Sequence, residues 1–258
     1  MIKRLIGVIT VKDGWAVQSM NFNTYLPMGR AEVIAENLDR WFLDEILILS
    51  IDRAGRGPDM DLLERVAAKN LTTPLTYGGG ITSAAQARQL VKLGADRLCL
   101  ETVCVRDVAA ARAIRDAVGI QAVIRALPLG VNNGHVQQLD YHFGRYQDLD
   151  VASFYTPDDP LFSEVLAIDA QNEGGLASFN PAILTPLIAH GLQVIAFGGI
   201  TTQDQIRTLY EMDNLSAVGV GNSLSYRELA TRDLISFAKM HATRTTSHGA
   251  QTRGVLEW

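Results

Sequence analysis

The sequence predicts an α/β fold of the (β/α)8 TIM barrel type, built from two half-barrel repeats. Short β-branched runs alternate with amphipathic segments along most of the chain, which is the pattern of βαβ units. The glycine stretch at residues 78–80 recurs at Gly198-Gly199, with Gly79 and Gly198 separated by 119 positions. The chain has 258 residues, a length that suits one barrel of eight such units.

The expected strands and helices follow one another in βα order. Short apolar runs predict strands at residues 5–11, 45–51, 75–77, 97–100, 122–127, 164–168, 193–197 and 217–221. Apolar residues at helical spacing predict helices at residues 31–41, 62–69, 84–93, 107–118, 181–189, 203–210 and 226–240. We expect residues 1–258 to form a single domain with a polar tail from about residue 243.

Two connections depart from this alternation. Residues 12–29 are expected to form a long loop, rich in Met, Asn and aromatic residues, which either packs on the barrel or offers a docking surface. After the fifth strand, Asn133-Gly134 lies between alternating residues and predicts a β-hairpin. Pro157 and Pro160 then leave room for at most a short helix.

Composition and charge exclude several functional classes. The net charge of -5 provides no basic surface for nucleic acid or anionic membranes. No apolar run approaches the roughly 20 residues that span a bilayer, and no signal peptide is evident, so we expect a cytoplasmic protein. Cys99 and Cys104 match no redox or metal spacing, and the five His residues are scattered. We therefore predict neither a metal nor a cofactor.

Several motifs, taken in order, resemble the family of the cyclase subunit of imidazole glycerol phosphate synthase (HisF). The resemblance runs from Lys3 to about Met240 and depends on order and spacing, since no single motif is decisive. It implies a barrel of two half-barrels that binds a glutaminase (HisH) at its bottom face. In that family, ammonia passes through the barrel and is used at the top face. The motifs are Lys3-Arg4-Leu5-Ile6, Val11-Lys12-Asp13-Gly14, Asp44-Glu45-Ile46, Tyr77-Gly78-Gly79-Gly80-Ile81, Gly94-Ala95-Asp96-Arg97 and Gly198-Gly199.

The chain departs from the family at the catalytic positions. The two Asp residues that the family uses in cyclisation align with Thr10 and Pro128. Threonine does not titrate near neutral pH, and proline offers no side-chain donor or acceptor for general acid–base catalysis. No Asp or Glu lies between residues 5 and 12 or between residues 119 and 134, so a shifted alignment restores neither carboxylate. We identify no catalytic residue.

Phosphate binding remains open. Backbone N–H groups of a Gly-Gly turn before a helix can approach a phosphate, and the alternative is that these glycines only form tight turns. In the first half, the family's Asn beside one phosphate aligns with Glu101, whose charge would repel a phosphate. A basic residue in the family's first loop aligns with Gln18. The candidate phosphate ligands are Gly79, Gly80, Thr102, Gly198, Gly199, Gly221 and Asn222.

The bottom of the barrel matches the family better. Arg4, Glu45, Arg97 and Glu164 each begin an expected strand and align with a charged ring that forms the family's ammonia gate. Asp96 aligns with a family residue at the glutaminase interface. Alternation along the strands then places Ile6, Val8, Cys99, Leu166 and Ile168 on the inner face. The alternative is that each strand simply starts in solvent with an ordinary charge.

These observations favour a relative that has lost the cyclase activity. The first hypothesis is a barrel that binds a HisH-like glutaminase and conducts ammonia to an acceptor enzyme. The resemblance allows that acceptor to be a third, ATP-dependent amidotransferase of surface-sugar acetamidino synthesis. The alternatives are a genuine cyclase of histidine biosynthesis that uses Glu101 or Glu173, a phosphosugar isomerase, and a structural protein without an ammonia path. Whether the chain is itself an enzyme stays open.

Overall fold

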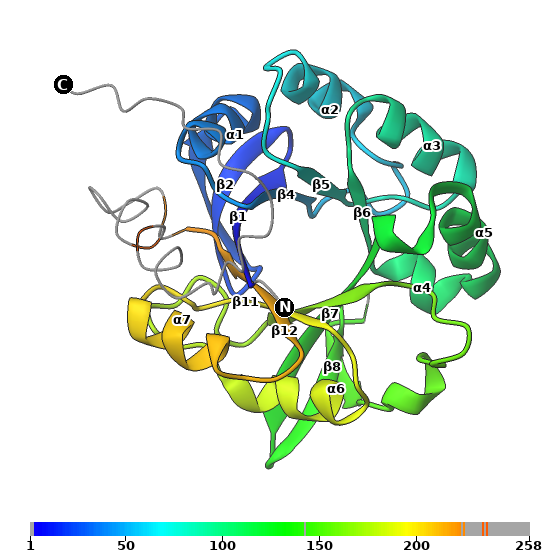
Figure 1. The fold of residues 1–258 in the computed structure, drawn as a ribbon, viewed down its shortest axis with the longest axis vertical. Helices are drawn as coiled ribbons and strands as arrows, with labels where there is room; N and C mark the ends of the chain where they lie inside the picture. Colours follow the sequence, from blue (N-terminus) through cyan, green and yellow to red (C-terminus); the bar gives the residue numbers. More distant parts are fainter. Residues whose placement is uncertain (1–2, 142, 223, 225–233, 235, 237–258) are drawn as a thin grey trace, which may run out of the picture.

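The computed structural model describes residues 3–141, 143–222, 224, 234 and 236. Eight parallel strands form a closed barrel, because their order runs β10-β11-β12-β1-β4-β5-β6-β7 and β7 pairs again with β10 (Figure 1). The predicted barrel is therefore confirmed. Its strands are β1 (Arg4–Lys12), β4 (Glu45–Ser50), β5 (Leu75–Gly78), β6 (Arg97–Leu100), β7 (Val123–Asn132), β10 (Glu164–Asp169), β11 (Val194–Phe197) and β12 (Leu215–Val220).

Helices surround the barrel, as Figure 1 shows. Each buries one apolar face against the strands; α2, for example, buries Leu62, Leu63 and Val66 and begins where the Asp59 carboxylate accepts a hydrogen bond from the Leu62 N–H. The predicted helix at residues 226–240 and the tail from about 243 lie largely or wholly outside the described residues. The α-helices are α1 (Ala31–Arg40), α2 (Met60–Ala67), α3 (Ala84–Lys92), α4 (Thr102–Arg106), α5 (Val108–Val118), α6 (Thr185–Ala189) and α7 (Gln203–Tyr210), and short 3-10 turns cover η1 (Ile120–Ala122), η2 (Val151–Ser153) and η3 (Pro181–Leu184).

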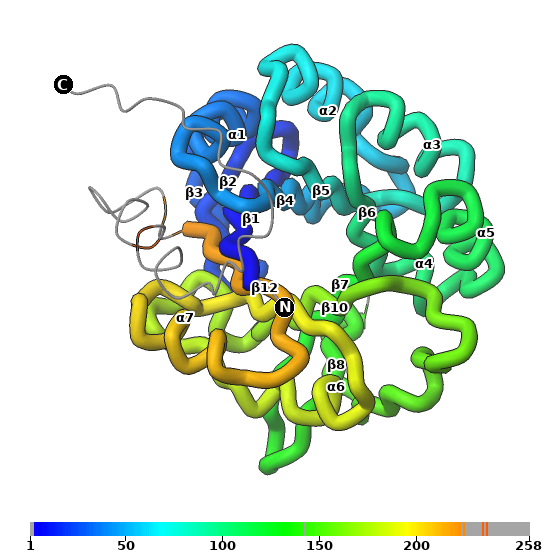
Figure 2. The backbone as a smooth tube through the Cα atoms, viewed as in Figure 1, coloured from blue at the N-terminus to red at the C-terminus, as the bar shows by residue number. Residues whose placement is uncertain are grey.

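A β-hairpin follows the first strand of each half-barrel. In the second half, Asn133-Gly134 forms the turn between β7 and β8 (His135–Asp140), which confirms the predicted hairpin, and β9 (Arg145–Asp148) then pairs with β8. The expected long loop over residues 12–29 was wrong, because β2 (Trp15–Met20) and β3 (Thr24–Gly29) form a hairpin there (Figure 2). Asp13 and Gly14 have φ values of 50° and 78°, so they make the same left-handed turn as Asn133 and Gly134.

The interior of the barrel is apolar. Inward-facing side chains from seven strands form one buried cluster, separate from the larger core between the strands and the helices. The five inner positions expected from alternation all belong to it. The cluster contains Ile6, Val8, Leu47, Leu49, Cys99, Ile124, Ala126, Leu166, Ile168, Ile195, Phe197 and Ala217.

The two glycine turns have matching backbone conformations. Gly79 and Gly80 have φ values of 124° and 74°, and Gly198 and Gly199 have 106° and 74°. A Cβ on Gly79 would lie 2.1 Å from the carbonyl oxygen of Ser50. Gly79 is therefore required by close packing against the end of β4, whatever else it does.

Candidate functional site

Four charged side chains meet at the bottom of the barrel, where the strands begin. Arg4 Nη1 lies 2.8 Å from Glu45 Oε2, and Arg4 Nη2 lies 2.5 Å from Glu164 Oε1. Arg97 Nη2 lies 2.5 Å from Glu164 Oε2, and Arg97 Nη1 lies 3.6 Å from Glu45 Oε2. Each carboxylate thus contacts both guanidinium groups, and the four residues form a closed ring of alternating charge. We call these four residues the charged ring.

Neighbouring polar groups hold the ring in place. Thr76 donates a hydrogen bond to the second carboxylate oxygen of Glu45, and Arg97 donates to Ser163 Oγ at 3.1 Å. Burial by itself would raise the pKa of Glu164, but the Arg4 and Arg97 charges outweigh it and the pKa is lowered. Thr76 was missed in the sequence, although it shares the inward phase of its strand with Gly78. Glu45 is 2 % exposed, so the pairing offsets a substantial desolvation cost.

Asp96 is exposed beside the ring and is not part of it. Its carboxylate accepts a hydrogen bond from the Leu75 N–H at 2.8 Å, and its own N–H donates to the Leu75 carbonyl. Asp44 makes the same pair of contacts with Leu5. Asp96 therefore satisfies the backbone hydrogen-bonding groups of Leu75, the first residue of β5. Its other carboxylate oxygen is left for a further contact.

At the top of the barrel, where the strands end, Thr10 and Pro128 are both buried. Carboxylates that could replace the missing pair are engaged elsewhere. Glu101 accepts a hydrogen bond from the Thr102 hydroxyl. Glu173 accepts from Ser19 Oγ at 2.9 Å and from the Phe22 N–H at 3.1 Å. Burial raises the pKa of both glutamates.

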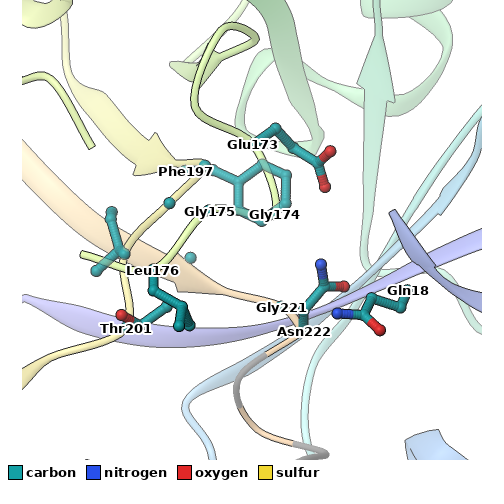
Figure 3. A pocket seen from close by; sticks show the side chains of 13 residues that line it. Gln18, Glu173, Gly174, Gly175, Leu176, Phe197, Thr201, Gly221 and Asn222 are labelled. Atoms are coloured by element: carbon teal, nitrogen blue, oxygen red, sulfur yellow. The ribbon is translucent and has the colours of Figure 1, made fainter. Parts of the chain in front are cut away.

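A pocket opens at the top, beside the second glycine turn. It brings together the predicted Gly198, Gly199, Gly221 and Asn222, together with Gln18 and Glu173. Figure 3 shows the side-chain amides of Gln18 and Asn222 pointing toward one another, with Thr201 across the pocket. The Asn222 amide already pairs with the Ser19 backbone. The backbone N–H groups of the turn, the Gln18 amide and the Thr201 hydroxyl suit a polar or anionic ligand.

The first-half candidates do not line this pocket. Gly79 and Gly80 form their own turn, and a Cβ on Gly80 would lie 2.5 Å from the Gly57 carbonyl oxygen. Thr102 opens the short helix α4 with its hydroxyl bonded to Glu101. The candidate set is therefore divided between two places in the molecule.

The helix that follows each glycine turn is already capped by its own side chain. Thr82 N–H donates to Gln86 Oε1 at 2.9 Å, and Thr201 N–H donates to Gln205 Oε1 at 3.0 Å. These glutamines were missed in the sequence, yet they repeat at the same 119-residue interval as Gly79 and Gly198. A ligand at the pocket would thus depend on the N–H groups of the glycine turn itself.

Among the described residues, no helix combines the length and apolar character needed to cross a membrane. Nor do the described residues include a group of three or more His, Cys, Asp and Glu side chains that could hold a metal ion.

The sequence matches known proteins over nearly its whole length. The family model described as "Histidine biosynthesis protein" matches residues 4–230. A "Putative imidazole glycerol phosphate synthase subunit hisF2" of Vibrio vulnificus is 30% identical over 233 residues, covering 88% of this chain and 85% of that protein. The HisF subunit of Pyrococcus furiosus is 25% identical over 242 residues, covering 92% and 95%. The HisF subunit of Staphylococcus carnosus is 28% identical over 221 residues, covering 83% and 87%. The chain therefore belongs to the histidine biosynthesis protein family and is a divergent HisF-like member of it.

Proposed function

We propose that this protein is the barrel subunit of a glutamine-dependent amidotransferase complex. It binds a HisH-like glutaminase at the bottom face and conducts ammonia through the barrel to an acceptor enzyme at the top. The names of its relatives as subunits of imidazole glycerol phosphate synthase support a complex of this type. A cytoplasmic location belongs to the same proposal.

One observation carries the proposal. The closed charged ring stands at one end of an apolar interior, and the other end has Thr10 and Pro128 in place of acid–base groups. Neutral ammonia can cross an apolar lining, whereas ammonium would meet a large desolvation cost. Side chains fill a barrel of this size, so ammonia would move through narrow gaps between them.

The partners follow from the two ends. The glutaminase would contact the charged ring and the free carboxylate oxygen of Asp96. At the top we propose a third protein of the complex, an ATP-dependent amidotransferase that uses the ammonia. Its pathway would be acetamidino-sugar synthesis. A genuine cyclase is less well supported, because Glu101 and Glu173 are bonded to neighbouring groups.

The conduit can be tested by narrowing it. Val8 and Cys99 are 7 % and 4 % exposed and both belong to the inner cluster. A Val8→Trp or Cys99→Trp variant should leave glutamine hydrolysis intact and raise the ratio of glutamate to aminated product several-fold. The measurement uses the reconstituted complex, and added free ammonium should rescue product formation if it enters from the top.

The matched control is Val8→Ala, which removes bulk at the same position and should keep the wild-type ratio. Because overpacking a core costs about 1–3 kcal/mol, circular dichroism must show that each Trp variant is folded. A folded Trp variant with the wild-type ratio would mean that ammonia does not travel through the barrel.

A further inference from the structure

The turn between β8 and β9 presents an aromatic ring to solvent at the top of the barrel. Phe143, in this turn, is 55 % exposed. Tyr141, two residues earlier, meets the ring of Phe22 edge to face, with 5.5 Å between the ring centroids. Phe22 itself packs against the inner cluster of the barrel. The turn that carries Phe143 is therefore held at the top end of the barrel.

Two arginines lie over the Phe143 ring. The Cζ atom of Arg145, the first residue of β9, is 5.0 Å from the ring centroid. The Cζ atom of Arg106, the last residue of α4, is 5.1 Å from the same centroid. Both arginines are exposed. The electron-rich face of an aromatic ring attracts a guanidinium group, so the ring favours one position for each long side chain.

The positive charge of these arginines is only partly neutralised. Arg106 Nη2 lies 3.5 Å from Asp140 Oδ2, and among the described residues no carboxylate forms an ion pair with Arg145. Stacking uses the flat face of a guanidinium group and leaves the N–H donors at its edge available to an incoming carboxylate. Because the chain as a whole has a net charge of -5, this is a local excess of positive charge on an acidic protein.

Exposed valines lie beside Arg106 along the chain. Val105 precedes it in α4, and Val108 begins α5. A single exposed apolar side chain is ordinary, but an exposed aromatic ring together with arginines and aliphatic groups has the composition of a protein interface. We call Val105, Arg106, Val108, Phe143 and Arg145 the aromatic–arginine patch.

The equivalent turn in the first half of the barrel forms no such patch. The turn between β2 and β3 consists of Asn21, Phe22 and Asn23, and none of these residues is charged. Phe22 packs against the inner cluster, whereas Phe143 is exposed. The patch is therefore a feature of the second half, on one side of the top end.

We propose that the aromatic–arginine patch docks an acidic surface of the acceptor enzyme. That this partner is the acceptor enzyme rests on the proposed function, which places the enzyme at the same end of the barrel. Phe143 fills an apolar depression of the partner, and Arg106 and Arg145 pair with carboxylates around it. Because the ring already orders both arginines, docking costs less side-chain entropy than it would with unstacked arginines.

The first test reverses one charge. The barrel–glutaminase complex is immobilised, and binding of the ATP-dependent amidotransferase is measured by surface plasmon resonance. Arg145→Glu should weaken this binding by about tenfold or more, because an attractive contact becomes a repulsive one. The matched control is Arg88→Glu, which makes the same charge change at an exposed position of α3 and should leave the affinity within about twofold of the wild type.

The two kinds of side chain should affect different rates. Arg145→Glu should mainly slow association and make it less sensitive to salt, because exposed charges steer the encounter. Phe143→Ala should mainly accelerate dissociation, because it removes the apolar anchor of the docked state. Arg145→Gln, which removes the charge without reversing it, should give an intermediate association rate. Circular dichroism of each variant should match that of the wild type, since all these positions are exposed.

The possible outcomes distinguish this docking surface from the proposed function. Equal affinity of the amidotransferase for wild type, Arg145→Glu and Phe143→Ala would overturn the docking surface and leave the proposed function standing. An amidotransferase that does not bind the wild-type complex would overturn both. Light scattering of the barrel alone tests a different occupant. Self-association that Arg145→Glu abolishes would mean that the patch joins two copies of this chain, contrary to the proposal.

Discussion

The two ends of the barrel treat buried carboxylates in opposite ways. At the bottom, Glu164 lies between two guanidinium groups, and their charges lower its pKa against the effect of burial. At the top, Glu101 and Glu173 accept hydrogen bonds from hydroxyl and backbone N–H groups, and burial raises the pKa of each. The bottom is arranged for fixed charge pairing. The top has neither the carboxylate pair of a cyclase nor a basic side chain at position 18.

The largest expected effect is the absence of cyclase turnover at the top of the barrel. The purified barrel should not convert the phosphoribulosyl aminoimidazole substrate of the cyclase when ammonium salt is supplied. Loss of one general acid–base group costs about 10²–10⁴-fold, and here both aligned positions lack one. Steady-state turnover against an authentic cyclase is the measurement. Thr10→Asp alone should restore nothing, because Pro128 and Gln18 remain, and turnover within about tenfold of the authentic cyclase would contradict the comparison.

The next largest effect is a loss of stability when the charged ring at the bottom of the barrel is broken. Glu45→Gln should destabilise the protein by about 3–5 kcal/mol, because it leaves Arg4 and Arg97 sharing one carboxylate in a buried site. Glu36→Gln is the matched control, since Glu36 pairs with Arg40 and Lys69 at the surface and should cost about 0–1 kcal/mol. Urea unfolding at neutral pH measures both. Equal losses would show that the charged ring behaves as ordinary surface pairs.

The barrel was predictable because it follows from short-range periodicity, whereas the four positions of the charged ring were assigned from the family resemblance. Strand alternation with period two places Arg4, Val8 and Cys99 inside, and the structure agrees. The antiparallel pairing of β1 with β2 was missed even though Asp13-Gly14, the turn between them, carries the same signal as Asn133-Gly134.

The contact between Ser19 in the first hairpin and Glu173 could not be predicted in this way. Ser19 and Glu173 are 154 positions apart, and no local pattern pairs a serine in β2 with a glutamate in the loop after β10. Their contact depends on how β2 crosses the top of the closed barrel. The same holds for the pocket, whose lining combines residues from the first hairpin and from the loops after β10, β11 and β12.

The smallest expected effect concerns pH. The stability cost of a Glu→Gln substitution should change in opposite directions with pH at the two ends of the barrel. The pKa of Glu164 is lowered from 4.5 in the folded protein, so its contribution to stability is present above about pH 4.5 and is lost as pH falls through the folded value. The pKa of Glu173 is raised from 4.5, so its contribution is fully present below about pH 4.5 and is lost as pH rises through the folded value. Glu164→Gln should therefore cost most at pH 7 and less at pH 3.5. The free energy of unfolding of Glu173→Gln, relative to that of the wild type, should be higher at pH 7 than at pH 3.5. Urea unfolding of the three proteins at both pH values measures the differences, and a shift of the same sign in both variants would mean that the two ends do not differ electrostatically as described.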